Sequence, residues 1–165
     1  MLAPRELEKS PLFRDISYEE YRKMLPCFQA AGHSYQPNEL IYDFSDPARD
    51  DVGVVERGDA SLIRIDEEGV ATVMEELGPG SVFGRNLAFA GPAGDSLEVI
   101  CRTACDVLFI DYPHILRRCE NACTYHSTLV QNMLRLMADK AQALSERIDV
   151  LSRRSNREKL LCYFR

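Results

Sequence analysis

The fold is decided by the stretch VGVVERGDASLIRIDEEGVATVMEE, which covers residues 52–76. It contains three short β-type runs, Val52–Arg57, Ser61–Ile65 and Val70–Glu76. Gly and Asp interrupt these runs at Arg57-Gly58-Asp59 and Glu67-Glu68-Gly69, and such residues are typical of tight turns. The pattern predicts consecutive antiparallel strands.

The same pattern continues on both sides of this stretch. Further strands are expected at Ala30–Tyr35, Glu39–Tyr42, Ser81–Phe83, Ser96–Cys101 and Val107–Ile110. Turn residues separate these runs, and no long helix lies between them. About eight short strands at turn spacing predict a mainly β fold, an antiparallel β-roll or jelly roll with flanking helices.

Short helical segments flank the predicted roll. Between Glu6 and Phe28, the sequence Ser17-Tyr18-Glu19-Glu20 combines a capping residue with acids in the first turn, as helix amino termini do. After Asp111 the apolar spacing becomes helical, and a short helix is expected over Tyr112–Cys119.

A long helix is expected from Thr124 to Leu151, a range that contains neither Gly nor Pro. Its apolar positions recur at alternating steps of four and three residues, the spacing of a coiled-coil seam. These positions are Val130, Leu134, Met137, Ala141, Leu144, Ile148 and Leu151. Such a helix spans roughly 40 Å, more than a small roll is expected to cover. We therefore predict a homodimer seam, with packing of the helix on its own domain as the alternative.

The last residues predict the start of another unit. Ser155 can cap a second helix, and the apolar residues of this helix have no later sequence to pack against. We expect three parts: residues 1–121 as a sensing roll, residues 122–154 as the dimerisation helix, and residues 155–165 as the start of a truncated carboxy-terminal domain.

Composition narrows the class of protein. The chain has 165 residues, with 20 basic and 26 acidic side chains and a formal net charge of −6. This balance argues against a broad nucleic-acid-binding surface within these residues. No apolar run reaches the length of a membrane span and the first residues are charged, so neither a membrane partner nor a signal peptide is expected. We expect a cytoplasmic protein whose six cysteines are reduced and mostly buried.

The order of a β-roll, a long helix and the sequence Ser155-Asn156-Arg157-Glu158-Lys159-Leu160-Leu161 resembles the Crp/Fnr superfamily of bacterial transcription regulators. Within the roll, Gly80-Ser81-Val82-Phe83-Gly84-Arg85-Asn86-Leu87-Ala88-Phe89 and then Gly94-Asp95-Ser96-Leu97 resemble the phosphate-binding cassette of cyclic-nucleotide domains. The resemblance covers nearly the whole chain. It implies an effector-sensing and dimerisation region whose DNA-binding domain lies beyond Arg165.

The cassette departs from the cyclic-nucleotide pattern at its two charged positions. The resemblance implies a Glu after the glycine and an Arg before the serine, whereas this chain has Arg85 after Gly84 and Asp95 before Ser96. One charge pair at ~5 Å contributes on the order of 3 kcal/mol at an effective dielectric near 20, so the exchange costs several kcal/mol of phosphate binding. Cyclic AMP is therefore not expected as the effector, whose identity stays unknown. Arg85 is expected either to pair with Asp95 or to bind an anionic effector itself.

The resemblance places the effector pocket at a small set of residues. They are Gly84, Arg85, Asn86, Leu87, Asp95, Ser96 and Ser145, the last because it offers a hydroxyl on the long helix.

We expect no catalytic residue and no metal ligand set. The alternatives are a stand-alone cyclic-nucleotide-binding-like regulatory domain and a jelly-roll metalloenzyme. The metalloenzyme would need a His-x-His group that the sequence lacks. Cys119, Cys123 and His126 are three possible metal ligands that lie close together in the sequence, and a metal assay would test them.

Overall fold

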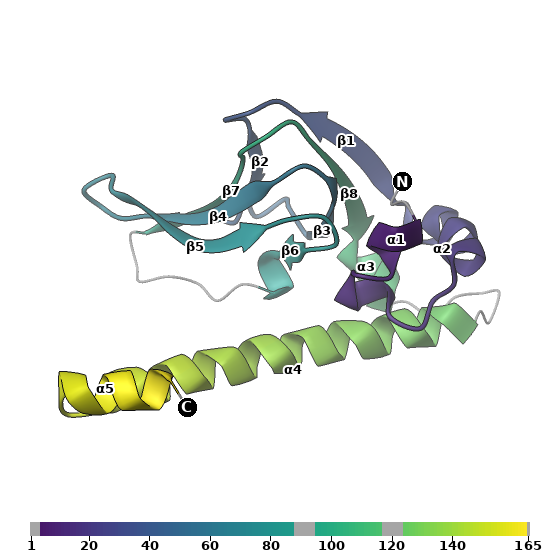
Figure 1. Ribbon diagram of the computed structural model, residues 1–165. Helices are drawn as coiled ribbons and strands as arrows, with labels where there is room; N and C mark the ends of the chain where they lie inside the picture. Colours follow the sequence, from purple (N-terminus) through teal and green to yellow (C-terminus); the bar gives the residue numbers. More distant parts are fainter. Residues whose placement is uncertain (1–3, 88–94, 117–123, 165) are drawn as a thin grey trace.

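The computed structural model describes residues 4–87, 95–116 and 124–164 and shows a β-roll beside a long helix (Figure 1). The strands of this part of the chain are β1 (Ala31–Tyr35), β2 (Leu40–Asp43), β3 (Asp51–Arg57), β4 (Ala60–Ile65), β5 (Ala71–Leu77), β6 (Val82–Gly84), β7 (Ser96–Cys101) and β8 (Cys105–Asp111). They form two four-stranded antiparallel sheets, with the orders β1-β8-β3-β6 and β2-β7-β4-β5. The predicted roll is confirmed, including every predicted strand.

Alternation along the strands divides the core into two clusters, because successive side chains point to opposite faces of a sheet. On β3, Val52 and Val54 belong to the cluster that packs against the helices, whereas Val55 belongs to the cluster between the two sheets. On β8, Leu108 and Val107 divide in the same way. The first sheet is thus apolar on both faces, which explains why its strands are the most continuously hydrophobic.

Short helices cover one end of the roll. They are α1 (Pro4–Leu7), η1 (Pro11–Phe13), α2 (Tyr18–Met24), η2 (Leu25–Phe28) and α3 (Tyr112–Leu116). The predicted cap at Ser17 is confirmed: its hydroxyl accepts the Glu20 backbone N–H at 3.3 Å, and its own N–H donates to the Glu20 carboxylate at 2.9 Å. Helix α3 begins at the predicted residue, and the predicted continuation to Cys119 lies outside the described residues.

Helix α4 (Thr124–Ser152) runs along one side of the roll (Figure 1). Its first half is attached to the domain, because Leu129, Met133 and Leu136 are buried in the helix-facing cluster. Val130, the first residue of the predicted seam, also packs on this cluster. The remaining six seam residues are exposed, which leaves an apolar stripe along α4 from Leu134 to Leu151.

The chain ends in helix α5 (Asn156–Tyr163) beside the last turns of α4. Ser155 caps it as predicted, accepting the Glu158 N–H at 3.2 Å. Its apolar side chains are exposed: they are Leu160, Leu161, Tyr163 and, after the helix, Phe164. No helix in the described ranges is both long and apolar enough to cross a membrane. The proposed partition at residue 121 falls outside the described residues.

Candidate functional site

The turn from β6 into η3 (Arg85–Leu87) carries the first cassette residues. Gly84 is buried with φ +149°, and a Cβ atom there would lie 2.8 Å from the Asp51 carbonyl oxygen. Only glycine fits this backbone without strain. The next N–H, that of Arg85, donates to the Tyr42 hydroxyl at 3.3 Å. The cassette backbone is therefore attached to the inside of the roll.

The charged residues of the cassette do not pair as predicted. The Arg85 side chain is exposed, whereas the Asp95 side chain is only 10% exposed and its carboxylate lies 3.5 Å from the Arg64 guanidinium. Arg64 lies opposite Leu97 in the β4–β7 register, and Asp95 directly precedes β7. The predicted Arg85–Asp95 pair is replaced by an Arg64–Asp95 ion pair, because β4 supplies a nearer cation from a position that the cassette pattern does not include.

A cavity of about 380 Å³ lies between the roll and α4. Strands β4, β5 and β7, the η3 turn and the second half of α4 all contribute to it. Its lining residues are Leu62, Met74, Glu75, Leu87, Leu97, Lys140, Ala143, Leu144 and Arg147. The volume is within the range of small-molecule sites, and the wall is mostly apolar.

The structure brings some of the expected pocket residues to this cavity and leaves others away from it. Leu87 lines the cavity, and Gly84 directly precedes the η3 turn that contains Leu87. Ser96 starts β7 opposite Ile65, next to Asp95. Ser145 is not among the residues that line this cavity, and it lines a surface hollow shared with α5. Asn86 lies within the η3 turn.

Two charged side chains of α4 reach the cavity. The Lys140 ammonium lies 3.0 Å from the Glu75 carboxylate of β5, and this ion pair links the helix to the roll. Arg147 lies two turns further along α4, and it forms no ion pair with another residue of the described ranges. The cavity therefore combines an apolar wall with one cation that has no counter-ion among those residues.

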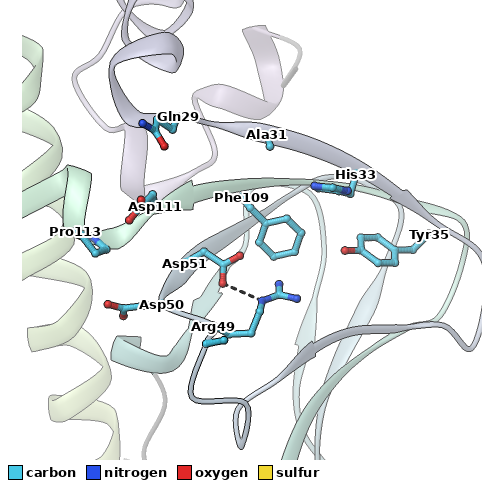
Figure 2. Close-up of a pocket in the computed structure, with 11 residues that line it drawn as sticks. Gln29, Ala31, His33, Tyr35, Arg49, Asp50, Asp51, Phe109, Asp111 and Pro113 are labelled. Atoms are coloured by element: carbon cyan, nitrogen blue, oxygen red, sulfur yellow. Dashed lines mark hydrogen bonds and ion pairs between the residues drawn. The ribbon is translucent and has the colours of Figure 1, made fainter.

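A second cavity, of about 600 Å³, lies at the opposite end of the roll near α3. Figure 2 shows the Arg49 side chain at its centre, beside Phe109 and with an ion pair to Asp51. The guanidinium carbon lies 4.6 Å from the Tyr42 ring centroid and 4.9 Å from that of Phe109. Arg49 thus has a carboxylate partner and two aromatic neighbours from within the chain.

The acidic rim of the second cavity is also partly occupied by the protein's own groups. The Asp111 carboxylate lies 2.7 Å from Nδ1 of His114, and Asp51 holds Arg49 at 3.1 Å. Because the cation and two of the acids already have partners, and because no cassette residue lines this space, we assign the candidate effector site to the smaller cavity beside α4.

The cysteines of the described ranges do not form a metal site. Cys101 and Cys105 are buried with their sulfur atoms 2.9 Å apart, as part of the core between the sheets. Burial is the main cause that raises the pKa of the Cys105 thiol to about 12, so this thiol stays protonated at neutral pH. No group of three or more metal-binding side chains occurs in residues 4–87, 95–116 and 124–164. Cys119 and Cys123 lie outside these ranges.

Sequence reasoning did not connect four charged residues with the candidate site: Glu75, Lys140 and Arg147, which line the cavity, and Arg64, which pairs with the cassette residue Asp95. One signal could have found two of them: Lys140, Leu144 and Arg147 follow the steps of a single helix face. The Arg64–Asp95 and Lys140–Glu75 pairs depend on tertiary structure, because their partners are distant in sequence.

Comparison with known proteins agrees with this geometry. The family model described as "Cyclic nucleotide-binding domain" matches residues 32–122, more than half of the chain. The structure is similar to the catabolite activator protein of Thermus thermophilus, with a TM-score of 0.68 and 22% identity over 87% of this chain and 63% of that chain. The comparison with curated proteins found no match.

Two further solved structures have the same fold. The amino-terminal domain of a transcriptional regulator from Streptomyces coelicolor matches with a TM-score of 0.60 and 18% identity over 91% of this chain and 99% of that chain. A cyclic nucleotide-binding domain from Methylobacillus flagellatus matches with a TM-score of 0.66 and 16% identity over 93% of this chain and 84% of that chain. The chain spans about 63% of the length of the Thermus protein. On the match of the family model and the geometry of the roll, the chain belongs to the cyclic nucleotide-binding domain family.

Proposed function

We propose that this chain is the effector-sensing and dimerisation region of a DNA-binding transcription regulator of the Crp/Fnr type, with an effector other than cyclic AMP. The observation that carries the proposal is the position of Leu144. This residue lines the cavity beside the cassette and is also a member of the exposed apolar stripe on α4. One helix thus forms a wall of the candidate sensor site and the predicted dimer seam.

The mechanism follows from that shared helix. A ligand in the cavity would contact the second half of α4, which lacks the buried anchor that Leu129, Met133 and Leu136 give to the first half. Any ligand that binds one arrangement of α4 more tightly shifts the population towards it. A shift at the seam would alter the geometry of whatever follows residue 165 in each protomer. This coupling connects sensing to DNA binding.

The charge at the cassette supports an effector other than cyclic AMP. Asp95 stands where the resemblance implies an arginine, and it already holds Arg64 at 3.5 Å. A cyclic phosphate placed here would meet a carboxylate, and taking Arg64 for itself would leave that carboxylate unpaired and mostly buried. Calorimetry with cyclic AMP is expected to give no micromolar binding. Micromolar affinity would contradict this part of the proposal.

The seam is tested by one charged substitution. Ile148 is 58% exposed and lies in the middle of the unattached half of the stripe. Ile148→Glu would place two like charges in the seam of a dimer, so sedimentation velocity should show a dimer for the parent chain and a monomer for the variant. Gln142→Glu adds the same charge away from the seam and should leave the dimer intact. A parent chain that stays monomeric at high concentration would refute the seam.

DNA binding is tested on the complete gene product. Two-fold related protomers bind two half-sites, so selection from random DNA should recover a palindrome. If the gene product selects no DNA sequence although its chain dimerises through α4, the regulator assignment fails and the regulatory-domain alternative is favoured.

A further inference from the structure

We propose that the cavity between the roll and α4 binds a small amphipathic carboxylate, with its head group on Arg147 and its apolar body against the leucines. This inference rests on the proposed function, which makes this cavity the effector site, and it adds the chemical class of the effector. The argument uses the wall of the cavity, its charges and the helix that carries them.

The wall selects an apolar body. Four leucines from four different elements line the cavity: Leu62 on β4, Leu87 on η3, Leu97 on β7 and Leu144 on α4. Leu144 is 36% exposed and Met74 is 38% exposed, so part of this apolar surface is in contact with solvent. An alkyl or aryl group would bury it, whereas sugar hydroxyls would leave hydrogen-bonding groups unpaired against carbon.

The charges select an anionic head group. Lys140 is neutralised by Glu75 at 3.0 Å, and Arg64, which does not line the cavity, is neutralised by Asp95 at 3.5 Å. Both pairs cancel, and Arg147 remains as the surplus cation. A guanidinium offers two parallel N–H donors, which match the two oxygens of a carboxylate. The surplus is a single charge, so a monoanion fits better than a phosphate dianion.

The position of these groups would let a bound ligand contact α4 and the roll at the same time. Lys140, Leu144 and Arg147 follow each other at steps of four and three residues, so they form one stripe on α4. A carboxylate on Arg147 and an apolar body between Leu144 and Leu97 would join this stripe to the roll. The ligand would then add to the contact that the Lys140–Glu75 pair makes between α4 and β5.

The test compares three probes with the same alkyl chain. Octanoate, 1-octanol and octylamine share their apolar body and differ only in the charge of the head group. Calorimetry on the 165-residue chain should show saturable binding of one octanoate per chain, tighter than 1-octanol by at least about tenfold. Octylamine should bind more weakly than 1-octanol. Octanoate that binds no better than 1-octanol, or that fails to saturate, would overturn the inference.

Two variants locate the head group. Arg147→Gln should reduce octanoate affinity by at least about tenfold and leave 1-octanol affinity unchanged. Arg154→Gln removes an exposed arginine that does not line the cavity, and it should leave both affinities unchanged. Circular dichroism checks that both variants are folded. Unchanged octanoate binding by Arg147→Gln would contradict the assignment of the head group.

Sedimentation separates this inference from the proposed function. Arg147 lies next to Ile148, so its guanidinium could instead contact a partner protomer. If Arg147→Gln dissociates the dimer while octanoate affinity is unchanged, Arg147 acts in the interface and the inference fails. If octanoate does not bind but Ile148→Glu still dissociates the parent dimer, the seam stands and only the effector class is wrong.

Discussion

At the scale of single residues, Gly84 is a cassette position whose backbone requires glycine. Its φ of +149° and the 2.8 Å approach of a Cβ atom to the Asp51 carbonyl exclude other side chains. Gly84→Ala should lower the free energy of unfolding by about 2 to 3 kcal/mol, since the backbone must leave a region that suits glycine alone. Urea unfolding measures this loss.

Gly32→Ala is the matched control for that substitution. Gly32 lies on the exposed strand β1, and a Cβ atom there would meet nothing within 4 Å. The same substitution should therefore change stability by less than about 1 kcal/mol. Equal losses at both positions would show that the close approach to Asp51 does not matter.

Asp106 links three strands and should make stability depend on pH. It accepts a 2.7 Å hydrogen bond from the Ser34 hydroxyl of β1 and lies 2.9 Å from the Arg57 guanidinium of β3. The Ser34 hydrogen bond, followed by the charge and hydrogen bond of Arg57, lowers the pKa of Asp106 in the folded state. A lowered folded-state pKa contributes stability above the unfolded-state pKa, and this contribution is lost as pH falls through the folded-state value.

Asp106→Asn should therefore be less stable than the parent chain at pH 7. The difference should shrink as pH falls below about 3.9, the ordinary value for an aspartate. Chemical unfolding at several pH values measures it. Asp139→Asn, on the exposed surface of α4, controls for the loss of a carboxylate. A gap that stays constant from pH 7 to pH 3 would show that Asp106 does not titrate differently in the folded state.

At the scale of elements, α4 is held to the domain by one buried amide as well as by apolar packing. Asn132 is 1% exposed, and its side-chain nitrogen donates to the carbonyl oxygens of Leu12 at 3.0 Å and Arg14 at 2.7 Å. These two hydrogen bonds give donors to carbonyl groups at the end of η1 and connect it to α4. Asn132→Ala should cost about 2 to 4 kcal/mol of unfolding free energy, because two carbonyls lose their donor.

Gln131→Ala is the control for the amide, since Gln131 is the exposed neighbour of Asn132 on the same helix. It should change stability by less than about 0.5 kcal/mol. Thermal unfolding of both variants against the parent chain tests the pair. A loss of less than 1 kcal/mol for Asn132→Ala would show that α4 is held by its apolar face alone.

At the scale of the whole molecule, α4 has an attached half and a free half. Before residue 137 one face of α4 is buried against the roll and the short helices, whereas most later side chains are exposed apart from the contacts around Lys140. In the monomeric Ile148→Glu chain, backbone amides of residues 141–152 should exchange with solvent faster than those of residues 128–136. Hydrogen-exchange mass spectrometry measures both segments.

The same comparison on the parent chain reports on the dimer. If the seam forms, residues 141–152 become protected and the two halves should exchange at similar rates. Slow exchange of residues 141–152 already in the monomeric variant would mean that the second half of α4 needs no partner. Protection that appears only in the dimer would show that the seam completes the fold.

The sequence by itself determined the elements of this protein. The eight strands of the described chain, the caps at Ser17 and Ser155 and the start of α4 were all predictable, because turn residues, alternation and capping act within a few residues of one another. The exchange of charges at Arg85 and Asp95 was visible in the same way, once the cassette pattern was recognised.

Only the tertiary structure decided how the charged groups are used. Asp95 binds Arg64 rather than Arg85, and Lys140 binds Glu75, because these partners meet through sheet register and helix placement. It also decided which part of α4 is attached, since its buried face and its apolar stripe differ by one position along the helix. These ion pairs and the choice of the buried helix face depend on distances between segments that are remote in the chain. The periodicity of a single segment carries no information about those distances.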